Sequence, residues 1–145
     1  MQSKPQILLV EDNQGDITLF KTAIIGVGKE YEIEIAKDGE EAMQILMGVS
    51  SGGDQFRPNL VFLDLNLPKV DGFQVLKLIR ERDGLKHLPV VVFSSSDAQA
   101  DIVKAYELNA NAYVIKPIQF NDYSLRIAET LEYWLNIVML PERYA

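Results

Sequence analysis

Acidic, hydroxyl and lysine side chains stand at the ends of four short apolar runs of the chain. Glu11 and Asp12 follow the first run, and Asp64 follows the second. Ser94 and Lys116 come at the ends of the third and the fourth. If these runs are strands of one parallel sheet, ligands bind beyond their carboxyl ends. We therefore expect these side chains to meet at one edge of the sheet.

This set of side chains suits a hard divalent cation and a phosphoryl group. Three close carboxylates repel, each pair by about 4 kcal/mol at about 4 Å with an effective dielectric near 20, and a cation removes that cost. The chain has no Cys and one His, His87, so oxygen ligands favour Mg²⁺ or Mn²⁺ over zinc. A lysine opposite could neutralise one phosphoryl oxygen and a hydroxyl could donate a hydrogen bond to another, as phosphoryl transfer requires.

Each of these residues also has an ordinary structural explanation. An acidic pair after a strand usually caps a helix, and Asp64 alone could be a turn residue. The hydroxyls of Ser94 to Ser96 alone would cap the next helix, and Lys116 alone would be a solvated lysine. These explanations account poorly for the joint placement of the set at consecutive strand ends.

The elements that must position the set follow from hydrophobic periodicity. Four runs have the length and β-branched content of buried strands in a parallel sheet. A fifth run alternates apolar and acidic residues, which suits an edge strand. The buried strands are expected at Ile7–Val10, Leu60–Leu63, Val90–Phe93 and Tyr113–Ile115, and the edge strand at Ile33–Ile35.

Helical patterns lie between these strands. Gly26 and Gly28 close the first, and Asp38 and Asp71 each precede a Glu or Gln by three residues, which is the spacing of a capping box. The fourth helix begins near Asp97 and ends at Asn109, a residue that tolerates a left-handed cap. The apolar positions we assign to the last two helices are Ile102, Val103 and Tyr106 in the fourth, and Phe120, Ile127, Leu131, Trp134 and Val138 in the fifth.

Alternating strands and helices predict an α/β fold, a doubly wound parallel sheet with right-handed crossovers. The length of 145 residues predicts one domain over 1–145, with about 132–145 as an apolar extension of the fifth helix. The stretch 48–58 is the one loop-like insertion. We expect the chain to have no signal peptide and no membrane span.

The charge balance narrows the classes of partner. The net charge of −7 and pI near 4.7 disfavour binding to nucleic acid or to anionic membranes. We therefore expect a cytoplasmic domain that binds protein, metal or small ligands.

Four segments together resemble the response regulator receiver domains of bacterial two-component signalling. They are ILLVEDN, VFLDLNLPKVDGF, PVVVFSSSD and NAYVIKP, and the resemblance covers roughly residues 6–131. It implies a flavodoxin-like (βα)5 fold with strand order 2-1-3-4-5. It also implies a Mg²⁺-dependent signalling switch, not an enzyme, whose partner is a sensor histidine kinase.

The resemblance assigns roles residue by residue. Asp64 is similar to the phosphoacceptor, and Glu11 and Asp12 to the acidic pair that holds Mg²⁺ with Asp64. Asn66 matches the position that gives a backbone carbonyl to the metal. Lys116 matches the family lysine that assists phosphoryl transfer.

The switch residues also carry over. Ser94 is similar to the hydroxyl that moves toward the phosphoryl group, and Ser95 to the small residue governing access to that group. Tyr113 resembles the aromatic residue that turns inward, which reshapes the surface of the fourth helix, fifth strand and fifth helix. Pro117 matches a proline whose preceding peptide is usually cis in the family.

The departures from the family pattern remove no required group. Asn109 stands where Gly is common, Ser95 replaces the commoner Ala, and the loop over 48–58 is long. That loop, the segment VEDNQGD and an apolar tail with Trp resemble the receiver-only regulators that partner phytochrome histidine kinases in cyanobacteria.

Two other functions use similar folds. A Mg²⁺-dependent phosphatase of the haloacid dehalogenase type needs a second acid two residues after the nucleophile, where this chain has Asn66. A flavin mononucleotide binder needs a hydroxyl- and Gly-rich loop after the first strand, where this chain has Glu11 and Asp12. Both are disfavoured.

The receiver pattern ends near 131–135, so we expect no DNA-binding domain in the chain. Apolar residues between Trp134 and Leu140 fall on more than one side of the last helix. We therefore expect a homodimer formed through that helix and its tail, with Trp134 as the anchor. The alternative is a tail that folds back on its own domain.

Overall fold

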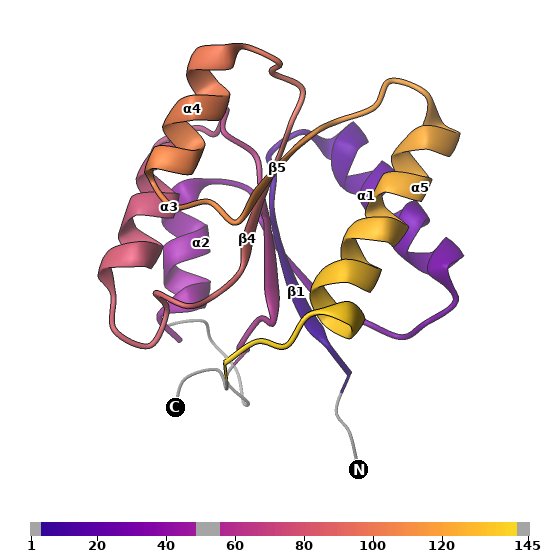
Figure 1. Cartoon of the computed structure of the whole chain (residues 1–145), viewed down its shortest axis with the longest axis horizontal. Coiled ribbons are helices and arrows are strands. Elements are labelled where there is room, and N and C mark those ends of the chain that lie inside the picture. Colours follow the sequence, from indigo (N-terminus) through magenta and orange to yellow (C-terminus); the bar gives the residue numbers. More distant parts are fainter. Residues whose placement is uncertain (1–3, 49–55, 142–145) are drawn as a thin grey trace.

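The fold is a five-stranded parallel sheet with helices on both faces (Figure 1). The computed structural model describes residues 4–48 and 56–141. The strand order is β2-β1-β3-β4-β5, as predicted. The strands are β1 (Gln6–Val10), β2 (Glu32–Ala36), β3 (Leu60–Leu63), β4 (Val90–Ser94) and β5 (Ala112–Ile115).

The helices divide between the two faces of the sheet (Figure 1). Helices α1 and α5 pack side by side on one face, and α2, α3 and α4 cover the other. Each face has its own apolar core, because side chains of the central strands alternate between the two. The helices are α1 (Gln14–Val27), α2 (Gly39–Leu46), α3 (Gly72–Glu81), α4 (Gln99–Glu107) and α5 (Phe120–Glu132).

Helix ends follow the expected signals. Asp38 caps α2, and Asp71 forms a full capping box with Gln74 at the start of α3. Gly28 ends α1 with φ of 80°, and Asn109 follows α4 with φ of 67°, both in the left-handed region. These caps determine where the loops at the two ends of the strands begin.

Two burial predictions are wrong. The strand at Tyr113–Ile115 is β5, which lies at a sheet edge and is only half-buried; Ile115 is 44% exposed. In α4 only Ala105 is fully buried, whereas Val103 and Tyr106 are 44% and 49% exposed. An edge strand offers a helix little surface to cover, so much of the predicted apolar stripe of α4 faces solvent.

The C-terminal segment continues α5 as a π-helical turn, η1 (Tyr133–Ile137). Trp134 and Leu135 are half-buried and pack against the core on the α1–α5 face. Tyr133, Ile137 and Met139 are exposed. Part of the tail, Trp134 and Leu135, therefore folds back on its own domain, as the alternative to a dimer predicted.

The first residue of the stripe predicted for the fifth helix is not buried. Phe120, placed in the packing stripe of the fifth helix, is 42% exposed. Residues 49–55 of the predicted insertion and 142–145 of the predicted extension lie outside the described residues. In the part of the chain that the structure describes, no helix has the length and apolar character needed to cross a membrane.

Candidate functional site

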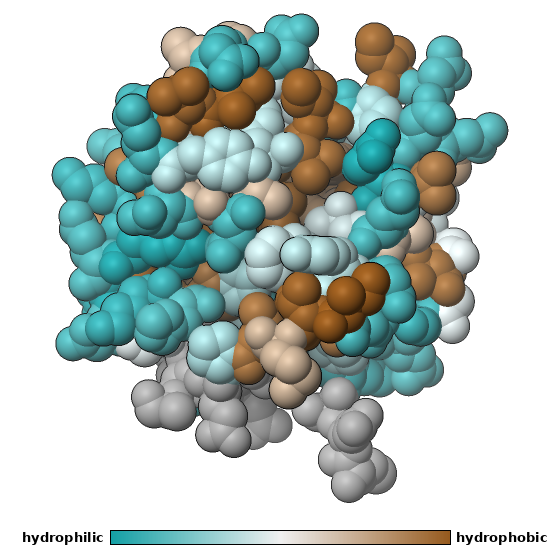
Figure 2. Space-filling view, viewed as in Figure 1, coloured by the Kyte–Doolittle hydropathy of each residue, from teal (hydrophilic) through white to brown (hydrophobic). Residues whose placement is uncertain are grey.

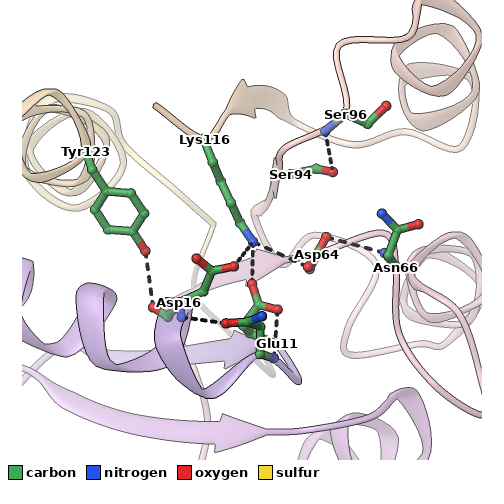
Figure 3. Close-up of polar contacts among 9 residues, drawn as sticks. Glu11, Asp16, Asp64, Asn66, Ser94, Ser96, Lys116 and Tyr123 are labelled. Atoms are coloured by element: carbon green, nitrogen blue, oxygen red, sulfur yellow. Dashed lines mark hydrogen bonds and ion pairs between the residues drawn. The ribbon is translucent and has the colours of Figure 1, made fainter. Parts of the chain in front are cut away.

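The carboxyl ends of four strands bring the predicted polar side chains together. Glu11 follows β1, Asp64 follows β3, Ser94 ends β4 and Lys116 follows β5. Figure 3 shows the side chains of Glu11, Asp64 and Lys116 pointing toward one another, with Ser94 nearby on the next strand. The parallel register of β1, β3, β4 and β5 aligns these strand ends at one edge.

Three carboxylates form a cluster that could hold a metal ion. One oxygen each from Glu11, Asp12 and Asp64 lies within 4.8 Å of the others. Glu11 and Asp64 are buried and Asp12 is exposed, so the cluster is closed on one side and open to water on the other. Oxygen ligands with an open side suit Mg²⁺, which retains part of its water shell.

Lys116 reaches into the cluster from β5. Its ammonium nitrogen lies 2.5 Å from Oε1 of Glu11 and 3.4 Å from Oδ2 of Asp64. Burial opposes the charged ammonium, but the hydrogen bond to Glu11 and the charges of Asp64 and Glu11 outweigh it and raise the pKa of Lys116. Lys116 therefore stays protonated at neutral pH and offers a positive charge beside Asp64.

Glu11 is the most buried acid of the site. Burial raises its pKa to about 7; the Lys116 hydrogen bond lowers it, and the charge of Asp64 raises it. The second oxygen of Glu11, Oε2, accepts the backbone N–H of Asn13 at 3.2 Å. A buried carboxyl with this pKa changes charge near neutral pH.

Asp16 also bonds to Lys116, and our sequence analysis did not identify it. Its Oδ2 accepts from the Lys116 ammonium at 3.0 Å across 100 residues of sequence. The sequence feature that could have pointed to Asp16 is its position as an acidic residue in the first turn of the helix after Glu11 and Asp12. An acid there is common because it suits the helix dipole, so the signal was not specific.

The loops after β3 and β4 supply the other predicted groups. The backbone N–H of Asn66 donates to Oδ1 of Asp64 at 3.3 Å. The buried hydroxyl oxygen of Ser94 accepts the backbone N–H of Ser96 at 3.2 Å, and Ser95 between them is exposed. Ser94 thus has no direct bond to Asp64 among the described contacts, although both lie at the same edge.

The aromatic residue Tyr113 is tied to the loop after β4. Its hydroxyl donates to the carbonyl oxygen of Ser96 at 2.9 Å, and its backbone N–H donates to the hydroxyl of Tyr106 at 3.1 Å. The ring is half-buried. Tyr113 therefore connects β5 to both ends of the segment that contains α4.

The peptide bond before Pro117 differs from the expectation. The described residues contain no cis peptide bond, so this bond is trans. Trans is the lower-energy form of an X–Pro bond in general. Pro117 still follows Lys116 at the end of β5.

A shallow depression of about 440 Å³ opens beside the exposed side of the cluster. It gives room for water and for a phosphorylated group to approach Asp12 and Asn66. Its lining residues are Asp12, Leu65, Asn66, Leu67, Pro68, Asp71 and Phe73.

Comparison with known proteins agrees with this geometry. Residues 7–128 match the family model described as the response regulator receiver domain. The probable methanogenesis regulatory protein FilR2 of Methanothrix harundinacea is 41% identical over 129 residues, which span 89% of this chain and 83% of that protein. The response regulator Rcp1 of Synechocystis is 38% identical over 135 residues, 93% of this chain and 92% of that protein.

Solved structures give the same result. The phosphorylated cyanobacterial phytochrome response regulator RcpA superposes with a TM-score of 0.90 at 37% identity, covering 97% of this chain and 100% of that one. The Mn²⁺-bound form of Rcp1 superposes with a TM-score of 0.82 at 36% identity, covering 94% of this chain and 99% of that one.

Proposed function

The chain belongs to the response regulator receiver family, and on that premise we propose that a sensor histidine kinase switches it by phosphorylating Asp64. The observation that supports this assignment is the position of the Asp64 carboxylate. It lies in a cluster with Glu11 and Asp12 and 3.4 Å from the Lys116 ammonium. These are the groups that phosphoryl transfer to a carboxylate requires.

The donor set fits Mg²⁺. Glu11, Asp12 and Asp64 would hold it with side-chain oxygens, and Asn66 would add its backbone carbonyl. The metal supplies charge neutralisation for the phosphoryl oxygens when it is bound. The Mn²⁺-bound form of Rcp1 shows that a relative binds a divalent cation.

The residues of the chain then perform the transfer. A carboxylate oxygen of Asp64 forms a bond to phosphorus while the bond from phosphorus to the imidazole nitrogen of the kinase phosphohistidine breaks. The imidazole nitrogen keeps the bonding electron pair. Lys116 neutralises a phosphoryl oxygen, and water later hydrolyses the acyl phosphate at the same site.

Ser94 and Tyr113 would report the phosphorylated state to the surface. The Ser94 hydroxyl, whose oxygen accepts the Ser96 N–H, would move and donate to a phosphoryl oxygen, and Ser95 would limit access to that oxygen. Tyr113 would release the Ser96 carbonyl and turn inward, and Pro117 would keep the loop after Lys116 in place. Two arrangements with a shifted population explain such a switch.

The output surface would be the one formed by α4, β5 and α5. Val103, Tyr106 and Ile115 leave apolar area exposed there. Figure 2 shows apolar patches over α4 and around the end of α5 and the segment that follows. We expect this surface, with the exposed Ile137 and Met139, to form a homodimer and to bind protein rather than nucleic acid.

The family is a signalling family, and the two alternative functions lose support. Asn66 is not an acid, so it could not serve as the second acid of a haloacid dehalogenase phosphatase. The buried Glu11 lies where a flavin phosphate would need neutral donors. RcpA is a phytochrome response regulator, so a phytochrome kinase is the first partner to test, and we place the chain in the cytoplasm with it.

Phosphotransfer from purified kinases tests the proposal. Each radiolabelled kinase is mixed with the chain in Mg²⁺ and, as the control, in excess chelator. We expect one kinase to transfer label rapidly in Mg²⁺ alone, and circular dichroism to show the chelated protein still folded. Transfer that is unchanged in chelator would contradict the metal role.

A further inference from the structure

Asp16 accepts a hydrogen bond from Lys116 but does not belong to the carboxylate cluster. Its Oδ2 is 3.0 Å from the ammonium, closer than Oδ2 of Asp64 at 3.4 Å. The cluster with mutually close oxygens contains Glu11, Asp12 and Asp64 but not Asp16. Figure 3 shows Asp16 reaching the ammonium from the start of α1, beside Glu11.

The contact between Asp16 and Lys116 is not explained by capping at the start of α1 alone. Asn13 caps α1, and an acid three residues later would ordinarily turn back to the backbone N–H of the cap. Here that N–H donates to Glu11 instead, so the Asp16 carboxylate is directed to Lys116. The hydroxyl of Tyr123 donates to the backbone oxygen of Asp16, which fixes this turn against α5.

The three acceptors of Lys116 differ in what else they do. Glu11 and Asp64 are also proposed metal ligands, so bound Mg²⁺ would offset their charge. Asp16 is not a proposed metal ligand, so Mg²⁺ would not offset its charge and its hydrogen bond to the Lys116 ammonium would remain. A phosphoryl group on Asp64 would then compete with Asp16 for the Lys116 ammonium, and the phosphoryl group and the Asp16 carboxylate would repel each other.

We propose that Asp16 is a positioning residue that restrains Lys116 and thereby disfavours the phosphorylated state. This inference rests on the proposed function, because it concerns the group that Lys116 would neutralise. Asp16 acts through Lys116 and does not touch the reacting atoms.

Binding of beryllofluoride in Mg²⁺, followed by ¹⁹F NMR, tests the inference. The matched control is Asp122→Asn, because Asp122 is exposed and holds the same third position in the first turn of α5. Since pairs that are partly exposed contribute modestly, we expect Asp16→Asn to bind beryllofluoride about fivefold more tightly than the wild type. Asp122→Asn should match the wild type, and Asp16→Glu should restore wild-type affinity.

Titration with Mg²⁺ alone separates this role from an effect on the metal site. Loss of a negative charge near the site should leave Mg²⁺ affinity equal or slightly weaker, so a gain for beryllofluoride could not come from tighter metal binding. Beryllofluoride binding by Asp16→Asn that equals or falls below that of the wild type would overturn the inference. If Asp16→Asn does not fold, Asp16→Ser carries the same test.

The outcome for the proposed function is separate. That proposal fails if the wild type itself shows no beryllofluoride binding that depends on Asp64. The inference about Asp16 fails only through the comparison among variants that bind.

Discussion

The ammonium nitrogen of Lys116 lies 3.4 Å from Oδ2 of Asp64, although 52 residues separate the two positions in the chain. Only 8% of the Lys116 side chain and 11% of the Asp64 side chain are exposed, so solvent ions screen this attraction little. The proposed acceptor carboxylate and the cation that would neutralise a phosphoryl oxygen are therefore in place before a phosphoryl group arrives. Such preorganisation is the main protein contribution to phosphoryl transfer.

The raised pKa of Glu11 predicts how stability depends on pH without metal. Burial raises this pKa from 4.5 to about 7, so between these values the folded protein holds a proton that the unfolded chain has lost. The free energy of unfolding should therefore fall as pH rises from about 4.5 to 7. Urea unfolding across this range should show the decrease in the wild type and a smaller one in Glu11→Gln; equal slopes would contradict the assignment.

The same pKa predicts the pH dependence of Mg²⁺ binding. A carboxyl must lose its proton to bind a metal, so Mg²⁺ affinity should rise from pH 6 to pH 8, by about tenfold at most. Calorimetric titration in buffers of different ionisation enthalpy should detect the released proton at pH 6. Affinity that does not change with pH would show that Glu11 is already ionised or is not a ligand.

Gly39 is expected to be essential for the packing of the loop after β3. A Cβ at Gly39 would lie 2.1 Å from the carbonyl oxygen of Val70, a backbone atom that cannot move without displacing the loop. Gly39→Ala should lower the free energy of unfolding by about 1–3 kcal/mol. Gly26→Ala is the control, since nothing lies within 4 Å of its Cβ position inside α1, and it should stabilise by up to about 1 kcal/mol.

Ser94 should couple phosphorylation to the surface without being needed for labelling. Its hydroxyl is fully buried and accepts the N–H of Ser96, whose carbonyl accepts the hydroxyl of Tyr113. Ser94→Ala should still bind beryllofluoride, but the amide NMR shifts in α4 and β5 should be much smaller. Ser94→Thr keeps the hydroxyl and should behave as the wild type. Full shifts in Ser94→Ala would argue against the switch.

The exposed part of the tail should carry the dimer. Ile137 is 64% exposed, so Ile137→Asp should dissociate the dimer without lowering stability. Ile25→Asp is the control, because Ile25 is 80% exposed on α1. Sedimentation equilibrium at micromolar concentration decides the matter. A full-length chain that is monomeric with and without beryllofluoride would contradict the dimer and leave only the fold-back role of Trp134 and Leu135.

Sequence periodicity predicted the sheet and the convergence of strand ends because both depend on local patterns. Runs such as Leu60–Leu63 are buried on both faces, and parallel strands end at one edge. Periodicity did not predict features that depend on which distant segments pack against each other. The apolar side of α4 faces solvent because β5 is an edge strand, and Asp16 meets Lys116 only through the packing of distant segments.

Phosphorylation of Asp64 is the central claim, and labelling of Asp64→Asn tests it most directly. The wild type and the variant are incubated with a radiolabelled histidine kinase in Mg²⁺, and circular dichroism checks that both are folded. We predict a label on the wild type that is stable in acid and lost in base, and no label on Asp64→Asn. Full labelling of Asp64→Asn would contradict the assignment of the acceptor.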